Sequence, residues 1–238
     1  MTLVKGVGFD SWRRVGSVMQ AIKVYNMRMV DELIFVDITA TLENRKPDFE
    51  LVDDFADECF MPLTVGGGVK DLSDVRSLLK VGADKVAINS SAITNPTIVN
   101  RAAEMFGSQC VVISIDVKKN NNGIYEVYSH SGKKSTGLDP VAHAIDMEKS
   151  GAGEILLTSI DLDGTMKGYD IDLIDKVAKA VNIPIIASGG AGTYAHMYNV
   201  VSKTKVDALA SASMYHFTEQ TPMEAKFYLK EKGINVRL

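Results

Sequence analysis

Short runs of apolar residues alternate along the chain with longer stretches in which apolar positions recur every three or four residues. The first pattern is typical of buried strands and the second of helices packed on one face. The runs predict seven strands, at 33–37, 63–65, 85–88, 110–116, 155–158, 184–187 and 207–210. The spaced positions predict eight helices, at 17–28, 48–59, 72–81, 96–106, 139–150, 173–181, 194–202 and 222–232. Only 118–134 breaks the alternation, and Asn120-Asn121-Asn122-Gly123 within it predicts a hairpin.

Strands that are apolar throughout and alternate with helices indicate a parallel sheet covered by helices on its outer face. Seven strands and eight helices are the elements of an α/β (β/α)8 TIM barrel that lacks its first strand. Such a sheet would keep two open edges, so we expect a longer protein or another occupant of the gap.

A glycine-rich turn after a strand occurs twice in the chain. Pro62-Leu63-Thr64-Val65-Gly66-Gly67-Gly68 has its counterpart 122 residues later in Pro184-Ile185-Ile186-Ala187-Ser188-Gly189-Gly190. Residues 32–35 and 154–157 repeat at the same offset, and 86–90 and 209–213 repeat at 123. Three landmarks in one order at nearly one spacing indicate an internal duplication.

The duplication predicts a single barrel domain, 1–238, made of half-barrels at about 1–106 and about 107–238. The strand at 111–116 opens the second half. Its counterpart would precede residue 1. We therefore expect the chain to begin inside the first loop of the barrel, at a methionine that is internal to a longer protein.

The bulk composition narrows the class of protein. The chain has 238 residues, of which 46% are hydrophobic and 24% charged, and its net charge of −4 argues against a broad nucleic-acid surface. No apolar run reaches the ~18 residues of a membrane span, and no signal peptide is visible, so a cytoplasmic protein without membrane attachment is expected. Four scattered histidines and two cysteines predict no metal site and no disulfide framework, and nothing in the sequence indicates a cofactor.

Polar residues at the carboxyl ends of the strands are the candidates for chemistry, because active sites of such barrels lie there. Asp37 and Asp161 are two such polar residues. The candidates for substrate binding are Asp163, Gly164 and Ser188 together with two sets related by the duplication: Gly67, Gly68, Asn89 and Ser90, and Gly189, Gly190, Ala212 and Ser213. Backbone amides and small hydroxyls at such turns suit phosphate. Two sites across one opening would suit a substrate with a phosphate at each end. The alternative is that the glycines only make turns.

Single charged residues complete the candidate site. Asp116 ends an apolar strand, where a partly desolvated carboxylate can act as a general acid or base, although it could equally cap a loop. Lys5, in a mobile flap around Gly6-Val7-Gly8, could meet a phosphate or remain solvated. Glu32, Lys85 and Glu154 lie at the opposite, amino-terminal ends, where the repeat mates Glu32 and Glu154 would face each other across the barrel axis.

Specific stretches also match a known family. The chain resembles the cyclase subunit of imidazole glycerol phosphate synthase over almost its whole length, in DELIFVDITAT (31–41), TVGGGVKD (64–71), GADKVAINSSA (82–92), FGSQCVVISIDVKK (106–119), SGKKSTG (131–137), GAGEILLTSIDLDGT (151–165), GYD (168–170), PIIASGGAG (184–192) and KGINVRL (232–238).

The resemblance implies a lyase of histidine biosynthesis that works as a heterodimer with a glutaminase. Ammonia from the glutaminase would enter at the bottom of the barrel. At the top it would convert a bisphosphorylated aminoimidazole carboxamide ribonucleotide to imidazole glycerol phosphate and aminoimidazole carboxamide ribotide. Asp116 matches the second of the family's two catalytic aspartates and Lys5 matches the lysine of its first loop. Glu32, Lys85 and Glu154 match three of the four charges of its ammonia gate.

Three departures from the family pattern keep alternatives open. The first catalytic aspartate and the gate arginine would lie on the strand that the sequence lacks. Gly16-Ser17-Val18 stands where an acidic Gly-Asp-Pro is usual, and Met166-Lys167 precedes Gly168. Similar variants resemble a paralogous branch that amidates a nucleotide-linked sugar of surface polysaccharides. A third possibility is a non-catalytic barrel that activates a glutaminase.

Overall fold

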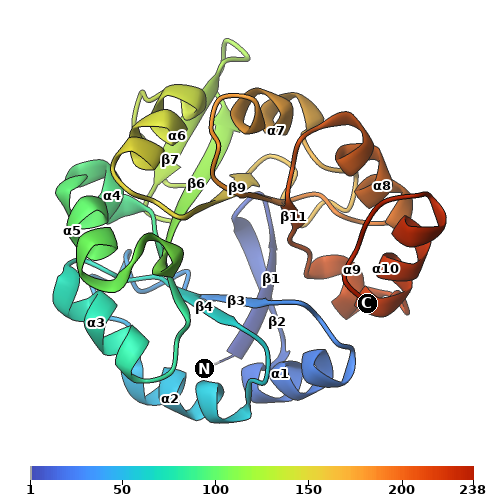
Figure 1. Cartoon of the computed structure of the whole chain (residues 1–238), viewed down its shortest axis with the longest axis horizontal. Coiled ribbons are helices and arrows are strands. Elements are labelled where there is room, and N and C mark those ends of the chain that lie inside the picture. Colours follow the sequence, from blue (N-terminus) through green and yellow to red (C-terminus); the bar gives the residue numbers. More distant parts are fainter. Residues whose placement is uncertain (1) are drawn as a thin grey trace.

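A curled sheet of parallel strands forms the centre of the molecule, and helices surround it (Figure 1). The computed structural model describes residues 2–238, so Met1, and with it the expectation about the start of the chain, lies outside the described residues. The strands of the main sheet follow one another in the order β3 (Leu33–Val36), β4 (Leu63–Gly66), β5 (Lys85–Ile88), β6 (Val111–Lys119), β9 (Glu154–Ser159), β10 (Ile185–Ser188) and β11 (Ala208–Leu209). This is the α/β architecture of a (β/α)8 barrel that the apolar runs predict.

The helices follow the predicted alternation, with boundaries shifted by one to three residues. They are α1 (Val18–Met27), α2 (Phe49–Glu58), α3 (Leu72–Lys80), α5 (Thr97–Phe106), α6 (Pro140–Lys149), α7 (Ile171–Ala178), α8 (Tyr194–Lys203) and α10 (Pro222–Glu231). Side-chain caps explain where several begin. Asp71 and Thr221, for example, form capping boxes with the residue three positions on, which satisfies free amides of the first turn.

Two short helices, α4 (Ser90–Thr94) and α9 (Ser213–Phe217), are not predicted by the sequence pattern. Five residues make little more than one turn, which is too short for the spacing of apolar positions to reveal a helix. Each begins a few residues after the carboxyl end of a strand, α4 after β5 and α9 after β11. They therefore bring Ser90 and Ser213 to the same end of the barrel.

The strand register has the periodicity expected of a duplicated half-barrel. Leu33 pairs with Leu63, and their counterparts 122 residues later, Ile155 and Ile185, pair in the same way. Thr64 pairs with Lys85, whereas its counterpart Ile186 pairs with Ala208, 123 residues after Lys85. The change of offset from 122 to 123 in the sequence therefore falls between β10 and β11.

Two hairpins extend the molecule beyond the main sheet. β6 continues to Lys119 and pairs in antiparallel fashion with β7 (Tyr125–Ser129), which in turn pairs with β8 (Lys134–Ser135), and this confirms the hairpin predicted at 118–134. The segment around Gly6-Val7-Gly8, predicted to be a mobile loop, is not irregular. This segment is an antiparallel hairpin, β1 (Thr2–Val7) and β2 (Asp10–Ser17), here called the flap. Its apolar residues do not alternate regularly with polar ones, so the sequence pattern does not reveal the strands.

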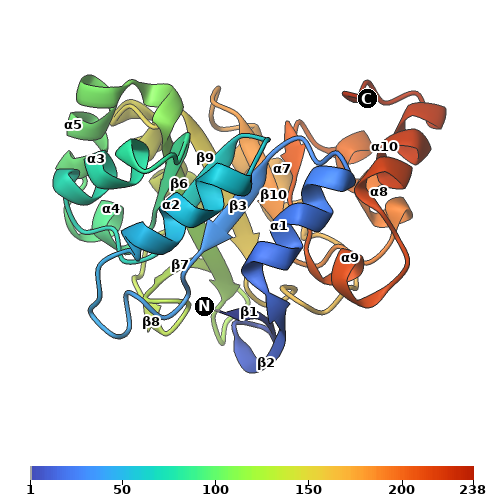
Figure 2. The same cartoon turned by 90° about the horizontal axis from the view of Figure 1, so that it is seen from below.

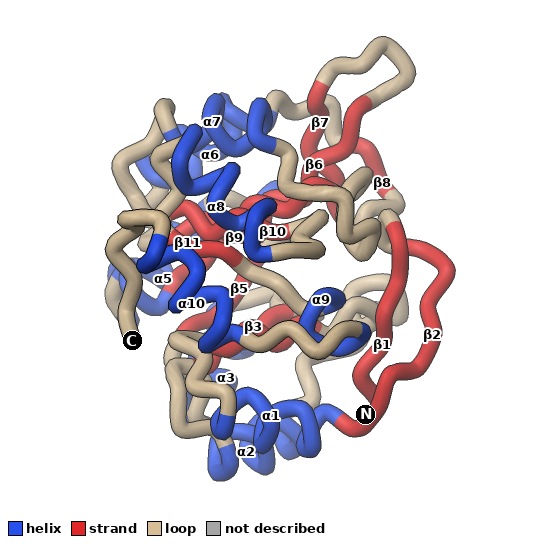
Figure 3. The backbone as a smooth tube through the Cα atoms, turned by 90° about the vertical axis from the view of Figure 1, so that its right-hand side faces the viewer, coloured by secondary structure: helices blue, strands red, loops and turns tan. Residues whose placement is uncertain are grey.

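The flap lies across one end of the barrel and is not part of the main sheet (Figures 2 and 3). Its backbone is tied to the loop after β9 by a hydrogen bond from the Gly8 amide to the Asp163 carbonyl, 3.0 Å long. At the turn, Phe9 lies against Gly132, where even a methyl group would be crowded. The flap thus covers the carboxyl ends of the strands.

The strands β3 and β11 are the ends of the curled sheet, and within residues 2–238 they are not paired with each other. The largest apolar cluster lies between the sheet and its helices and includes Ile113, Leu157 and Leu173. A cavity of about 1360 Å³ reaches from the flap through the inside of the curl to the amino ends of the strands, and it extends to residues of α1, α8 and α10. No helix among residues 2–238 is long and apolar enough to cross a membrane.

Candidate active site

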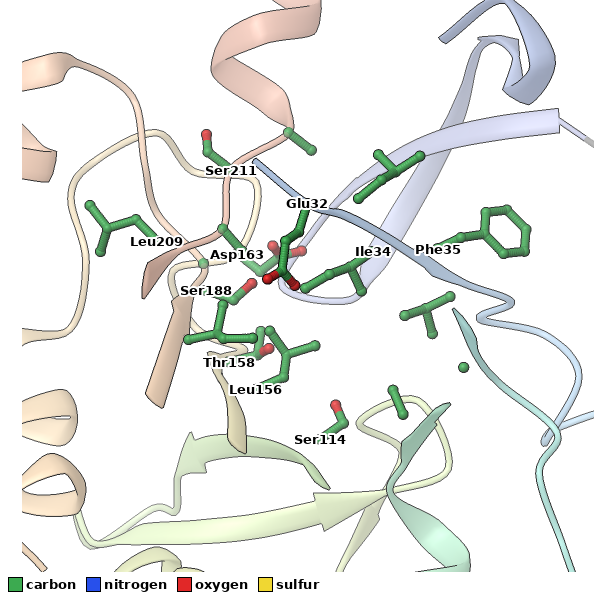
Figure 4. A pocket seen from close by; sticks show the side chains of 18 of the residues that line it. Glu32, Ile34, Phe35, Ser114, Leu156, Thr158, Asp163, Ser188, Leu209 and Ser211 are labelled. Atoms are coloured by element: carbon green, nitrogen blue, oxygen red, sulfur yellow. The ribbon is translucent and has the colours of Figure 1, made fainter. Parts of the chain in front are cut away.

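Nearly all the predicted site residues line this one cavity. They are Asp116, Gly67, Gly68, Asn89, Ser90, Asp163, Gly164, Ser188, Gly189, Gly190, Ala212 and Ser213 near the flap, and Glu32 and Glu154 at the opposite end. Lys5 and Lys85 do not line it. Figure 4 shows Asp163, Ser188 and Thr158 directed into the cavity from neighbouring loops and strands. The parallel sheet brings them together because all its strands end at the same side.

Asp116 is the most strongly perturbed carboxyl group in this cavity. It lies in the second half of β6, is 9% exposed, and its Oδ2 accepts a hydrogen bond from the side-chain amide of Asn89 at 2.9 Å. Burial, and secondarily the negative charge of Asp163, raise the pKa of Asp116 to about 7. A carboxyl group with a pKa near neutrality can both donate and accept a proton under physiological conditions.

Asp163 is a second carboxyl group with a raised pKa. It follows β9, its amide bonds the Ser159 carbonyl at 3.0 Å, and its side chain faces the cavity. Burial raises its pKa to about 6, against the opposing effects of the Gly164 amide and the positive charge of Lys5. Asp163 in turn acts on Asp116, because its negative charge helps to raise the pKa of that group. The sequence identified Asp163 only as a substrate-binding residue and gave no sign of this electrostatic effect.

The paired glycines after β4 and β10 are required by close backbone packing. Gly67 and Gly189 have φ of +98° and +91°, a region that residues with a side chain rarely adopt. A Cβ at Gly189 would lie 2.6 Å from the Ser159 carbonyl, and a Cβ at Gly67 would run into the corresponding carbonyl of Asp37. Both turns thus pack against the end of the preceding strand, in the same way in each half. This packing accounts for the glycines as turn residues, and it also leaves their backbone facing the cavity.

The hydroxyl and amide groups beside these turns already have protein partners in the first half. Asn89 is held by Asp116, and the Ser90 hydroxyl bonds the Asn89 side chain and accepts from the His130 amide at 3.1 Å. In the second half, Ala212 and Ser213 form the start of α9 beside Ser211, whose buried hydroxyl has no hydrogen-bond partner among the described residues. The two candidate phosphate sites therefore have similar backbone turns, but their side chains are hydrogen-bonded differently.

At the amino ends of the strands, Lys85 joins the two glutamates that the repeat relates. Its Nζ lies 2.8 Å from Glu32 Oε2 and 2.6 Å from Glu154 Oε1. Burial opposes the charge on Lys85, but the hydrogen bonds to both carboxylates outweigh it and raise its pKa. Glu32 and Glu154 are therefore joined through Lys85.

Comparison with known proteins identifies the family. The sequence profile described as "Histidine biosynthesis protein" matches residues 1–221. The chain belongs to this histidine biosynthesis protein family. It is 48% identical over 237 residues to "Imidazole glycerol phosphate synthase subunit HisF" of Clostridium botulinum, which covers 99% of this chain and 94% of that protein. It is also 48% identical over 236 residues to the protein of the same name from Dehalococcoides mccartyi, with 99% and 93% covered.

Lys5, like Lys85, does not line the cavity of this family member. Lys5 is on β1, and its Nζ lies 4.9 Å from the centre of the Phe217 ring, which the Arg13 guanidinium also approaches at 4.5 Å. These cation–π contacts attach the flap to α9. Lys5 still lowers the pKa of Asp163 through its charge, so it remains close enough to influence the site electrostatically.

The sequence did not predict the ion pair beside the first glycine turn, which joins the buried Asp37 to a partly exposed Arg45. Asp37, which ends β3, accepts from the backbone amide and hydroxyl of Thr39 and from Arg45, whose Nη1 lies 3.1 Å from Oδ2. Burial alone would raise the pKa of Asp37, but the bonds from Thr39 and Arg45 outweigh it and lower the pKa. Asp37 therefore stays charged and organises the loop over the cavity. The one indication of this role in the sequence was the position of Asp37 after a predicted strand.

Proposed function

We propose that this chain is the cyclase subunit of imidazole glycerol phosphate synthase. It would use ammonia from a partner glutaminase to convert a bisphosphorylated aminoimidazole carboxamide ribonucleotide, here called the bisphosphate substrate. The nitrogen of ammonia enters the new imidazole ring, water leaves, and the products are imidazole glycerol phosphate and aminoimidazole carboxamide ribotide. Relatives that are 48% identical across 99% of the chain carry this subunit's name, which supports the assignment.

The observation that carries the proposal is the pair Asp116 and Asp163 in the cavity. Ring formation requires protons to move between nitrogen and oxygen atoms, and this needs groups that change protonation near the working pH. The pKa of Asp116 is raised to about 7 and that of Asp163 to about 6. Asp116 would act as the acid–base group, oriented by the amide of Asn89.

The two glycine turns would hold the phosphate ends of the substrate. Their backbone amides border the cavity at positions related by the duplication, with Gly67 and Gly68 on one side and Gly189 and Gly190 on the other. Gly164, Ser188 and Ser213 would add an amide and hydroxyls, and the unpartnered Ser211 hydroxyl lies on the same side. A ligand with two phosphates would span the opening beneath the flap.

The charged group at the other end of the cavity would admit ammonia. Lys85 donates hydrogen bonds to both Glu32 and Glu154 where the cavity reaches the amino ends of the strands. A glutaminase docked against this face would release ammonia next to the group. The cavity would then guide it to Asp116, away from water that would protonate it.

Calorimetric titration of the folded chain with the bisphosphate substrate tests this function. Micromolar binding at a stoichiometry near one, lost on Ser213→Glu substitution, would support it, because a carboxylate there would repel a phosphate. Turnover is then followed with ammonium salts and, separately, with glutamine and a glutaminase subunit. A folded chain that does not bind the substrate would contradict the proposal. It would favour a relative that amidates nucleotide-linked sugars, or a barrel that only activates a glutaminase.

A further inference from the structure

The flap carries an aromatic side chain that the proposed chemistry leaves without a role. Trp12 lies in β2 and is the single tryptophan of the chain. It lines the same cavity as Asp116 and Asn89, yet 41% of it stays exposed to solvent. A large indole that packs the core is usually buried much further. Trp12 therefore presents an aromatic surface at the mouth of the cavity.

The position of the indole is set by the hairpin itself. A Cβ on Gly6, in the facing strand β1, would lie 2.7 Å from Trp12 Cδ1 and 3.3 Å from Nε1. The pyrrole edge of the indole thus lies directly over the bare backbone of Gly6, a place that no other residue type would leave free. The absence of a side chain at Gly6 therefore leaves room for this edge of the ring on the hairpin.

The flap is held over the cavity at three points independent of Trp12. The Gly8 amide bonds the Asp163 carbonyl, Phe9 packs on Gly132, and Arg13 lies over the ring of Phe217. These contacts lie at the tip and along one edge of the hairpin. Trp12 is thus placed at the mouth by a hairpin that is anchored to the loops bearing the catalytic groups.

We propose that Trp12 is a binding residue whose indole stacks on the planar heterocycle of the substrate, between the two phosphate-binding turns. This inference rests on the proposed function, which supplies a ligand with a flat aminoimidazole carboxamide ring. An aromatic face suits such a ring because stacking is strong and needs no hydrogen-bond pattern. Trp12 would select ligands that carry a base over phosphorylated sugars that lack one.

Because Trp12 is the only tryptophan, the fluorescence of the chain reports on this residue alone. The chain is titrated with two probes, aminoimidazole carboxamide ribotide and ribose 5-phosphate, and the dissociation constants are measured in parallel by calorimetry. Stacking predicts that the ribotide quenches the fluorescence and shifts its maximum. Ribose 5-phosphate, which lacks the ring, should leave both nearly unchanged even at saturation.

Variants separate stacking from simple packing. Trp12→Leu should weaken binding of the ribotide roughly tenfold or more but leave binding of ribose 5-phosphate within about twofold, whereas Trp12→Phe should retain most of the affinity. Ile124→Ala is the matched control, because Ile124 is 60% exposed on the other hairpin and does not line the cavity. Circular dichroism and thermal melting confirm that each variant folds.

The outcomes distinguish this inference from the function on which it rests. Tight ribotide binding with unchanged fluorescence, and equal affinity of Trp12→Leu, would overturn the stacking role and leave the proposed function standing. A wild-type chain that binds neither probe nor the bisphosphate substrate would overturn both. Equal losses for both probes in Trp12→Leu would show that Trp12 only supports the flap, which also overturns the inference.

Discussion

The side-chain amide of Asn89 donates to the carboxylate of Asp116 across 2.9 Å, from the end of β5 to the carboxyl half of β6. The same amide nitrogen lies 3.4 Å from the carbonyl of Tyr128 on β7. Asn89 therefore connects the catalytic candidate to the hairpin that follows it. The orientation of the Asp116 carboxyl group therefore depends on contacts that join three neighbouring strands.

Substitution of Asp116 tests its role in catalysis. Asp116→Asn keeps the shape of the side chain and can still accept from Asn89, but it cannot exchange a proton. With the bisphosphate substrate and ammonium salts, we expect turnover to fall by about 10²–10⁴-fold while calorimetric affinity changes little. Steady-state kinetics measures the first and calorimetry the second. Unchanged turnover would remove Asp116 from the mechanism.

The same variant makes a prediction about stability and pH. An unfolded aspartate loses its proton near pH 4, whereas burial raises the pKa of Asp116 to about 7 in the folded chain. Between these values the folded state holds the extra proton, so this group lowers stability progressively as pH rises. Asp116→Asn should therefore melt like the wild type near pH 4 and roughly 10 °C higher at pH 7 to 8. An equal difference at all pH values would contradict the raised pKa.

Asp163 should control the pH dependence of the reaction. Its negative charge contributes to the raised pKa of Asp116, second to burial. Asp163→Asn removes that charge, so the acidic limb of the pH–kcat profile should move to lower pH. If Asp163 acts only as a substrate ligand, KM would rise and the limb would stay in place. Measuring both parameters from pH 5 to 9 separates the two roles.

Lys85 should matter for both stability and ammonia transfer. Lys85→Met would leave Glu32 and Glu154 facing each other in a partly buried site, and we expect a loss of about 2 kcal/mol in the free energy of unfolding. Turnover with glutamine and a glutaminase should fall more than turnover with ammonium salts.

Lys176→Met is the control for this prediction. It removes an exposed ion pair with Asp172 one helical turn away, and it should change stability by less than about 0.5 kcal/mol. Urea denaturation measures both variants. An equal effect of the two substitutions would show that the partly buried Lys85 contributes no more to stability than an exposed lysine.

The glycine turns should tolerate no side chain. Gly67→Ala and Gly189→Ala combine a positive φ with a collision against a neighbouring carbonyl, so each should cost more than about 2 kcal/mol of stability. Gly123→Ala also has a positive φ, of +75°, but its Cβ would meet open space, so we expect a loss of only about 1 kcal/mol. Comparable losses at all three positions would mean that strain alone, rather than close packing, explains the glycines.

The sequence by itself determined the order and type of nearly all the long elements, because the periodicity of apolar residues is a local property of each helix and strand. It also determined the duplication, since Leu33–Leu63 and Ile155–Ile185 are equivalent pairs that a constant offset reveals. The place of Asp116 at a strand end followed from the same pattern. Short or polar segments such as α4, α9 and the flap escaped it because they carry too few apolar positions.

Only the tertiary structure decided how the site residues interact. The raised pKa of Asp116 comes from burial and from Asp163, which lies 47 positions later in the chain. Lys85 bonds Glu32 and Glu154, and Asn89 turns to Asp116 instead of remaining free for a phosphate. Hydrogen bonds and desolvation depend on distances of a few ångströms between remote segments. Those distances exist only once the sheet has curled and brought its strand ends to one side.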